Sequence, residues 1–143
     1  MQISYGGVAV QNFSDLTVTF NDNITPLYTI NGTLTPFKYS RGGFREVTVN
    51  GTMYFSDRVA LNNFTAETQA QLLVTIVNTK TAVQSGYFNQ LVIDIPQLKV
   101  TAFKPGVSGP GEVAVPLTAR GVLDPTSSYV AQFILTNTYA AGY

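Results

Sequence analysis

The sequence predicts a mainly β, antiparallel fold, either a β-sandwich or a partly closed barrel of about seven strands with one α-helix. Several segments alternate apolar and polar residues with a period of two, and turn-forming residues separate them. Only one segment has helical spacing. Because each pair of parallel strands needs its own crossover, a single helix is too little for a βαβ architecture, and we expect mainly antiparallel pairing.

Residues 16–20 give the clearest strand, because three large apolar residues alternate there with two threonines. The polar run Asn-Asp-Asn at residues 21–23 then breaks the pattern, and we interpret it as a turn rather than a calcium loop. Alternation resumes over residues 44–57. Within that second strand, Gly51 is predicted to mark a bulge.

Two segments are predicted to project from the sheet. Residues 25–43 mix short apolar pieces with prolines and glycines, and we expect a long hairpin arm or loop. Residues 104–112 are rich in glycine and proline and are expected to form a second hairpin tip. The second segment lacks the Gly-Lys-Ser/Thr order of a phosphate-binding loop.

The predicted helix covers residues 65–78, with Thr65 as its N-cap, Glu67 in its first turn and Asn78 at its end. Its apolar residues follow at spacings of four, three and four, at Ala66, Ala70, Leu73 and Val77.

Four more strands are predicted after the helix, over residues 90–95, 98–103, 113–123 and 129–137. Pro96 separates the first two of them. Pro116 lies inside the third and favours an edge or a bulge there, since proline cannot donate to a ladder.

Composition argues for an assembled structural protein. The 143 residues suit one domain, spanning residues 1–143, with its own core. Charged residues make up 11% of the chain, against about 25% in typical domains, and the formal net charge is zero. Because a soluble monomer usually carries a net charge of magnitude ~2–8, we expect much of this surface to be covered by partners.

The residue inventory excludes most catalytic chemistry. The chain has no Cys and no His, so it lacks a Ser-His-Asp triad, a Cys-His pair and the common transition-metal sites. A glycosidase could use two of four carboxylates, Glu46, Asp57, Asp94 and Glu112, but solvated positions on polar strand faces explain them better. We therefore expect no enzyme, no cofactor and no metal.

The sequence also argues against a membrane protein and against a protein that grips nucleic acid. No signal peptide or membrane span is evident. Eight Lys and Arg residues balance eight Asp and Glu residues, so no basic field exists to neutralise many phosphates.

Aromatic residues gather along the predicted arm. They could stack sugars or bases, or anchor a subunit interface, and the low charge favours the interface. An equally simple interpretation is that several of them belong to the core. The predicted oligomer contacts are Tyr28, Phe37, Tyr39 and Phe44 in the arm, with Phe103, Val107 and Pro110 near the second tip.

The order of segments resembles the tail tube proteins of long-tailed bacteriophages, which are related in fold to type VI secretion tubes. The matching pieces are Leu-Thr-Val-Thr-Phe-Asn-Asp-Asn-Ile at residues 16–24 and Gly-Gly-Phe-Arg-Glu-Val-Thr-Val-Asn-Gly-Thr at residues 42–52. Residues 91–96 and the closing segment, residues 119–124 to 135–137, are similar to the last strands of that family. The resemblance covers nearly the whole chain, although many members are longer and carry this pattern in their second half.

This resemblance implies a structural protein of the phage tail. Copies would join edge to edge into a continuous inner barrel wall, with the arm and the helix making contacts within and between stacked rings. The rings would be hexamers, or trimers if the full protein has two such domains, and would form a conduit for DNA in contact with other tail proteins. A lumen poor in Lys and Arg suits the passage of a polyanion. The protein would be assembled in the cytoplasm of the bacterial host and reside in the virion tail.

Two other interpretations remain open at this point. One is another virion component of similar fold, such as a tail completion, baseplate or capsid decoration protein. The other is a carbohydrate-binding or adhesin module whose exposed aromatic residues stack on sugar rings.

Overall fold

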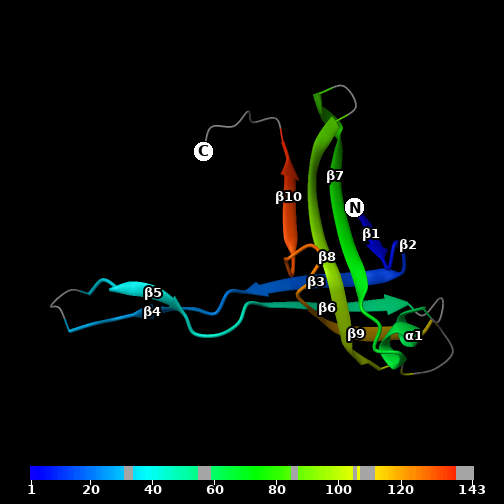
Figure 1. Cartoon of the computed structure of the whole chain (residues 1–143). Helices are drawn as coiled ribbons and strands as arrows, with labels where there is room; N and C mark the ends of the chain where they lie inside the picture. Colours follow the sequence, from blue (N-terminus) through cyan, green and yellow to red (C-terminus); the bar gives the residue numbers. More distant parts are fainter. Residues whose placement is uncertain (31–33, 55–58, 85–86, 105, 107–111, 138–143) are drawn as a thin grey trace.

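The computed structural model describes residues 1–30, 34–54, 59–84, 87–104, 106 and 112–137 (Figure 1). Every pairing between its strands is antiparallel. In chain order the elements are β1 (Gln2–Tyr5), β2 (Val8–Val10), β3 (Phe13–Asn21), β4 (Ile24–Leu27), β5 (Lys38–Arg41), β6 (Glu46–Tyr54), α1 (Val59–Thr65), β7 (Ala70–Gln84), β8 (Tyr87–Phe103), β9 (Ala114–Gly121) and β10 (Gln132–Thr136).

One eight-stranded sheet forms the body of the molecule, in the order β2-β1-β7-β8-β9-β6-β3, with β10 paired to β8 beside β9. This sheet bends over on itself into two layers. The long-strand layer contains β2, β1, β7, β10 and the first part of β8; the cross layer contains β9, β6, β3 and the last part of β8. In Figure 1 the strands of the cross layer run across those of the long-strand layer.

The mainly β, antiparallel prediction is therefore confirmed, with one short helix. The sheet is open rather than closed, because no ladder joins β2 to β3 in the described part of the chain.

The core lies between the two layers and is built from alternate residues of the strands, as the period of two requires. Full burial of an aliphatic side chain contributes about 1.5–3 kcal/mol. The largest fully buried side chains come from both layers and are Leu72, Ile95, Leu98, Val49 and Val115.

The predicted helix over residues 65–78 is wrong. Thr65 ends α1 instead of capping a helix, and the residues from Ala70 onward form β7. Four residues in a row, 74–77, are Val-Thr-Ile-Val, and such β-branched side chains lose rotamer freedom in a helix and fit a pleated surface. Leu72 and Val74 alternate into the core, so tertiary burial follows the strand period.

Pro96 does not divide two strands as predicted, because β8 runs through it from Tyr87 to Phe103. On one edge of β8 the ladder to β10 ends at Asp94 and the ladder to β9 begins at Leu98. On the other edge the register shifts between Ile95 and Leu98, and Pro96 has no ladder partner. The donor that proline lacks is therefore not needed at this position.

The other two predictions of irregular pairing differ in outcome. Pro116 pairs with Thr52 of β6 and lies beyond Leu117, the last residue of β9 that pairs with β8, so it occupies a local edge as predicted. The bulge expected at Gly51 lies instead in the neighbouring strand β3, between Phe13 and Asp15.

Candidate assembly surfaces

A hairpin of β4 and β5 projects from the sheet at one end of the molecule (Figure 1). It forms a separate two-stranded sheet whose register runs from Ile24 opposite Arg41 to Leu27 opposite Lys38. An isolated hairpin is at best marginally stable in water, since it buries little apolar surface. This arm, residues 24–41, nevertheless exposes large apolar side chains at Ile24, Leu27, Tyr28, Ile30, Leu34, Phe37 and Tyr39.

The base of the arm is fixed by a turn centred on Asn23. Its φ of 49° lies in the left-handed region, which asparagine tolerates better than most residues. The Asn23 carbonyl accepts a hydrogen bond from the Gly42 amide at 2.7 Å, and the Asn23 side-chain amide donates to the Phe44 carbonyl. A Cβ at Gly42 would lie 3.0 Å from Thr25 Oγ1, so glycine lets the two sides approach. The arm therefore leaves the sheet in a defined direction.

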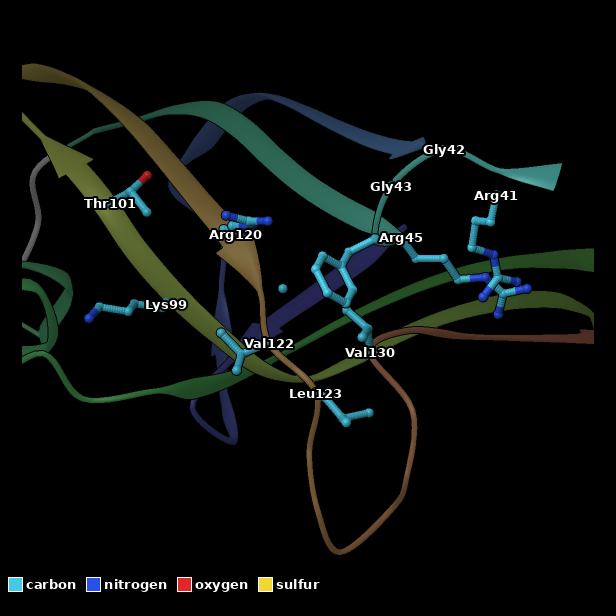
Figure 2. Close-up of a pocket in the computed structure, with 12 residues that line it drawn as sticks. Arg41, Gly42, Gly43, Arg45, Lys99, Thr101, Arg120, Val122, Leu123 and Val130 are labelled. Carbon is cyan, nitrogen blue, oxygen red and sulfur yellow. The ribbon is translucent and has the colours of Figure 1, made fainter. Parts of the chain in front are cut away.

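A groove of about 1000 Å³ lies beside the base of the arm. Figure 2 shows the side chains of Arg41 and Arg45 on one side of it and those of Lys99 and Thr101 on the other, with Arg120 between them in this view. Three of the four cations already pair with carboxylates: Arg45 with Asp22 at 2.8 Å, Lys99 with Glu67 at 3.0 Å and Arg120 with Glu46 at 3.4 Å.

These exposed ion pairs contribute about 0–1 kcal/mol each. The groove brings no nucleophile and base together, and the described residues contain no group of three or more acidic side chains that could hold a metal ion. We find no catalytic arrangement there.

The edge strand β10 is the second exposed apolar surface. Among the described strands it pairs only with β8, so one row of its backbone N–H and C=O groups faces outward. Phe133, Ile134 and Leu135 are all exposed, Leu135 by 66%. Residues 132–136 carry no charge, although charged residues are a common protection of strand edges against pairing.

Two carboxylates anchor the connection that leads into β10. Asp124 accepts hydrogen bonds from the Ser127 hydroxyl at 2.6 Å and from Gln97 Nε2 at 2.9 Å. The hydrogen bond from Ser127 is the main cause that lowers the pKa of Asp124.

On β8, Asp94 accepts from Gln71 Nε2 at 2.7 Å and from the Tyr129 hydroxyl at 2.8 Å. The hydrogen bond to Asp94 is the main cause that raises the pKa of Tyr129. Both carboxylates thus fix the position of the edge strand through residues of β8 or β7.

The predicted contact residues fall into three groups. Tyr28, Phe37 and Tyr39 lie exposed on the arm, and Phe44 at its base is 91% exposed. Phe103 is 5% exposed and its ring lies 6.5 Å from that of Phe64, so we assign it to the core, where α1 packs on β8. Its predicted contact role does not fit this burial. Val107 and Pro110 lie outside the described residues.

The edge of β10 was not among the predicted contact surfaces. Residues 129–137 were predicted as a strand, but without a prediction of how many neighbours that strand has. The available signal was the uncharged run Phe-Ile-Leu at residues 133–135, since three consecutive apolar residues place at least one on each face of a strand.

Comparison with a family model settles the identity. Residues 1–121 match the model described as phage tail tube protein. The chain belongs to the phage tail tube protein family. This family is structural, so the tail tube protein is not an enzyme, and its place is the tail of the virion. In the described part of the tail tube protein, no helix has the length and apolar character of a bilayer span.

Solved structures support the same fold. The tail tube protein is similar to a chain of the virion of a native gene transfer agent particle, with a TM-score of 0.59 and 12% identity over 91% of this chain and 88% of that one. It is similar to the anti-feeding prophage cap, with a TM-score of 0.59 and 8% identity over 94% and 87% of the two chains.

A third match is the SPP1 tail tube, with a TM-score of 0.51 and 10% identity over 83% of this chain and 72% of that one. Comparison with curated protein sequences gives no match.

Proposed function

We propose that copies of this tail tube protein close into hexameric rings, and that the rings stack into a tube through which DNA passes. The observation that carries the proposal is that, among the described strands, the long-strand layer has open edges on both flanks. On one flank lies β10. On the other lie β2 and, beyond the pair Gln2–Thr75, the rest of β7.

A sheet that is open on both flanks can continue from one copy into the next by backbone pairing. Such a contact joins two different surfaces of the chain and is therefore heterologous. It makes a closed ring when a whole number of copies, each rotated by the same angle from the last, completes one full turn. The apolar, uncharged edge of β10 is a hazard in a monomer but becomes buried in such a ring.

The number six is supported by a solved structure that is similar to this chain. The tail of an empty gene transfer agent particle, described with C6 symmetry, is similar to this chain with a TM-score of 0.58 and 12% identity. A protein that contributes one such domain would supply one sixth of such a ring. A longer protein with two such domains would form trimers instead.

The arm is proposed to make contacts beyond the ring. Its exposed residues Tyr28, Phe37 and Tyr39 lie away from the edges of the long-strand layer, on a hairpin that projects from the body (Figure 1). Aromatic side chains of this kind are enriched in protein interfaces. We place them, with Phe44, against a copy in the neighbouring ring or against another tail protein.

Negative-stain electron microscopy of the purified protein, together with light scattering, tests this proposal. We expect rings and tubes whose end views have six-fold symmetry. Three-fold end views would contradict a hexamer of single domains but would still support the formation of a tube. A protein that stays monomeric at high concentration would overturn the proposal.

A further inference from the structure

The groove beside the base of the arm gathers half of the positive charges of the chain. Four of the eight Lys and Arg residues line it, namely Arg41, Arg45, Lys99 and Arg120 (Figure 2). On β8 and β9 the groove lies on the surface that faces away from the core, because Leu98, Val100 and Ala119 are buried and their neighbours point outward. The lining belongs to β5, β8, β9 and the connections that follow β5 and β9, so it lies apart from the edge strand β10.

Two of these cations face each other across a pair of strands. Lys99 of β8 is the direct partner of Arg120 of β9. Like charges directly opposite each other destabilise a sheet, and both side chains are partly exposed to solvent. Each charge is offset by one carboxylate, that of Glu67 for Lys99 and that of Glu46 for Arg120. A local conflict of this kind between sequence and stability is expected at functional sites.

The arginines of the groove can bind further carboxylates and keep their present partners. Arg45 contacts its carboxylate partner through Nε, and so does Arg120. A guanidinium has five N–H donors, so the terminal nitrogens of both side chains can donate to a second carboxylate. Arg41 forms no ion pair with the described carboxylates. The groove therefore has unused capacity for anionic groups.

Exposed apolar side chains stand beside these cations. Phe44 and Leu123 line the groove and are 91% and 57% exposed. Val122 and Val130 lie in the same lining (Figure 2). Cationic and apolar groups together fit a peptide segment that carries both carboxylates and an apolar side chain.

A nucleic acid fits the groove less well than such a peptide. The four cations and their three carboxylate partners leave one uncompensated positive charge. A phosphate backbone carries one charge at every nucleotide, and its binding depends on how many phosphates Lys and Arg neutralise. A short acidic segment can instead combine two or three charged contacts with the burial of an apolar side chain.

The 143 residues of this chain do not contain a segment of that kind. Its acidic residues stand at positions 15, 22, 46, 57, 67, 94, 112 and 124, so the closest two are seven positions apart. In an extended strand this separation amounts to about 23 Å. Six of the seven described acidic side chains also accept a hydrogen bond or form an ion pair within their own chain. A second copy would bring single carboxylates to the groove, not a cluster.

We infer that this groove binds an acidic segment of a different protein, with at least two closely spaced carboxylates and an apolar side chain. Arg41 and Arg120 pair with the carboxylates, and Phe44 and Leu123 cover the apolar side chain. This site goes beyond the proposed ring and does not depend on it, since all of its residues belong to one subunit.

Fluorescence anisotropy of a dye-labelled peptide, Glu-Phe-Glu-Gly-Glu, titrated with the purified full chain tests the inference. The control probes are the same peptide with Gln in place of each Glu, and an oligothymidylate of equal formal charge. The substitutions are Arg41→Gln and Arg120→Gln in the groove. Lys80→Gln is the matched control, because it removes the same charge from an exposed position of β7.

We expect the acidic peptide to bind saturably, with an affinity that falls as salt is added, and to bind more tightly than either control probe. Arg41→Gln and Arg120→Gln should each lower this affinity by about three- to tenfold, because a charge-assisted hydrogen bond is lost. Lys80→Gln should change it by less than about twofold, since its charge is distant and screened. Circular dichroism of each variant checks the fold, and Arg41→Gln breaks no ion pair with a described carboxylate.

The inference is overturned if the acidic peptide does not saturate, if the Gln peptide binds equally well, or if Lys80→Gln weakens binding as much as Arg41→Gln. Tighter binding of the oligothymidylate would make the groove a polyphosphate site instead. Groove variants that keep the peptide affinity but no longer form tubes would make it a contact between copies. Failure of the unsubstituted protein to form tubes contradicts the proposed function alone.

Discussion

The rings of Phe20 and Phe133 lie with their centroids 4.6 Å apart and their planes tilted by 59°. Phe20 belongs to β3 in the cross layer and Phe133 to β10 in the long-strand layer. The pair therefore joins the two layers where the body meets the base of the arm. It also braces the edge strand that we propose as the contact between neighbouring copies.

We expect Phe133→Ala to lower the free energy of unfolding of the subunit by about 1–2 kcal/mol. Full truncation of a buried Phe costs about 3–5 kcal/mol, but this side chain is half exposed. A double-mutant cycle with Phe20→Ala should give a coupling of about 0.5–1.5 kcal/mol for the ring contact. Urea unfolding of the four proteins measures both values, and purely additive effects would contradict the brace.

Gly51→Ala should destabilise the subunit by about 1–3 kcal/mol, the usual cost of overpacking. A Cβ at Gly51 would lie 2.8 Å from the backbone carbonyl oxygen of Asp15, which cannot rotate away. Gly106→Ala is the matched control, since a Cβ there would have no neighbour within 4 Å among the described residues, and it should stay within about 0.5 kcal/mol of the parent. Thermal unfolding of both variants gives the comparison, and equal melting temperatures would refute the close approach.

Deleting residues 33–40 should leave the eight-stranded sheet folded but abolish higher oligomers. The deleted segment carries Phe37 and Tyr39, and β4 and β5 pair only with each other among the described strands. Circular dichroism checks the fold and light scattering checks assembly. As a control, Tyr54→Ser removes an exposed aromatic side chain outside the arm and should leave assembly intact. Rings or tubes formed by the deletion variant would show that the arm assignment is wrong.

Stability should depend on the ionisation of Asp124 at acidic pH. Its pKa in the folded protein lies below the ordinary value of 3.8, mainly because the Ser127 hydroxyl donates to it. A carboxylate with a lowered folded pKa stabilises the protein above its unfolded pKa, and this stability is lost as the pH falls through the folded value.

Asp124→Asn keeps an acceptor oxygen but cannot ionise, so its melting temperature should fall less steeply than that of the parent below pH 3.8. Melting curves of both proteins, recorded through this acidic range, provide the measurement. Parallel curves would exclude Asp124 as a source of the acid sensitivity.

How far the sequence predicts this fold depends on the element. Residues 16–20 and 44–57 were predicted as strands because one face of each strand is apolar, and the structure contains β3 and β6 there. Residues 65–78 were misassigned, because apolar residues at a few helical spacings outweighed the β-branched run in the prediction. The arm left a local signal in its prolines, glycines and aromatic residues.

The edge of β10 could not be found in the same way. Whether a strand has one neighbour or two depends on which strands its partner β8 already pairs with, and that is a property of the whole sheet. Phe103 shows the same limit for a single residue, because its burial depends on α1 and on strands distant in the sequence.

Strand β8 belongs to both layers, and this continuity has a mechanical consequence. A load that pulls the long-strand layer away from the cross layer acts on the packed core between the layers and also on the covalent backbone of β8 through Pro96. The two layers should therefore deform as one body under tension.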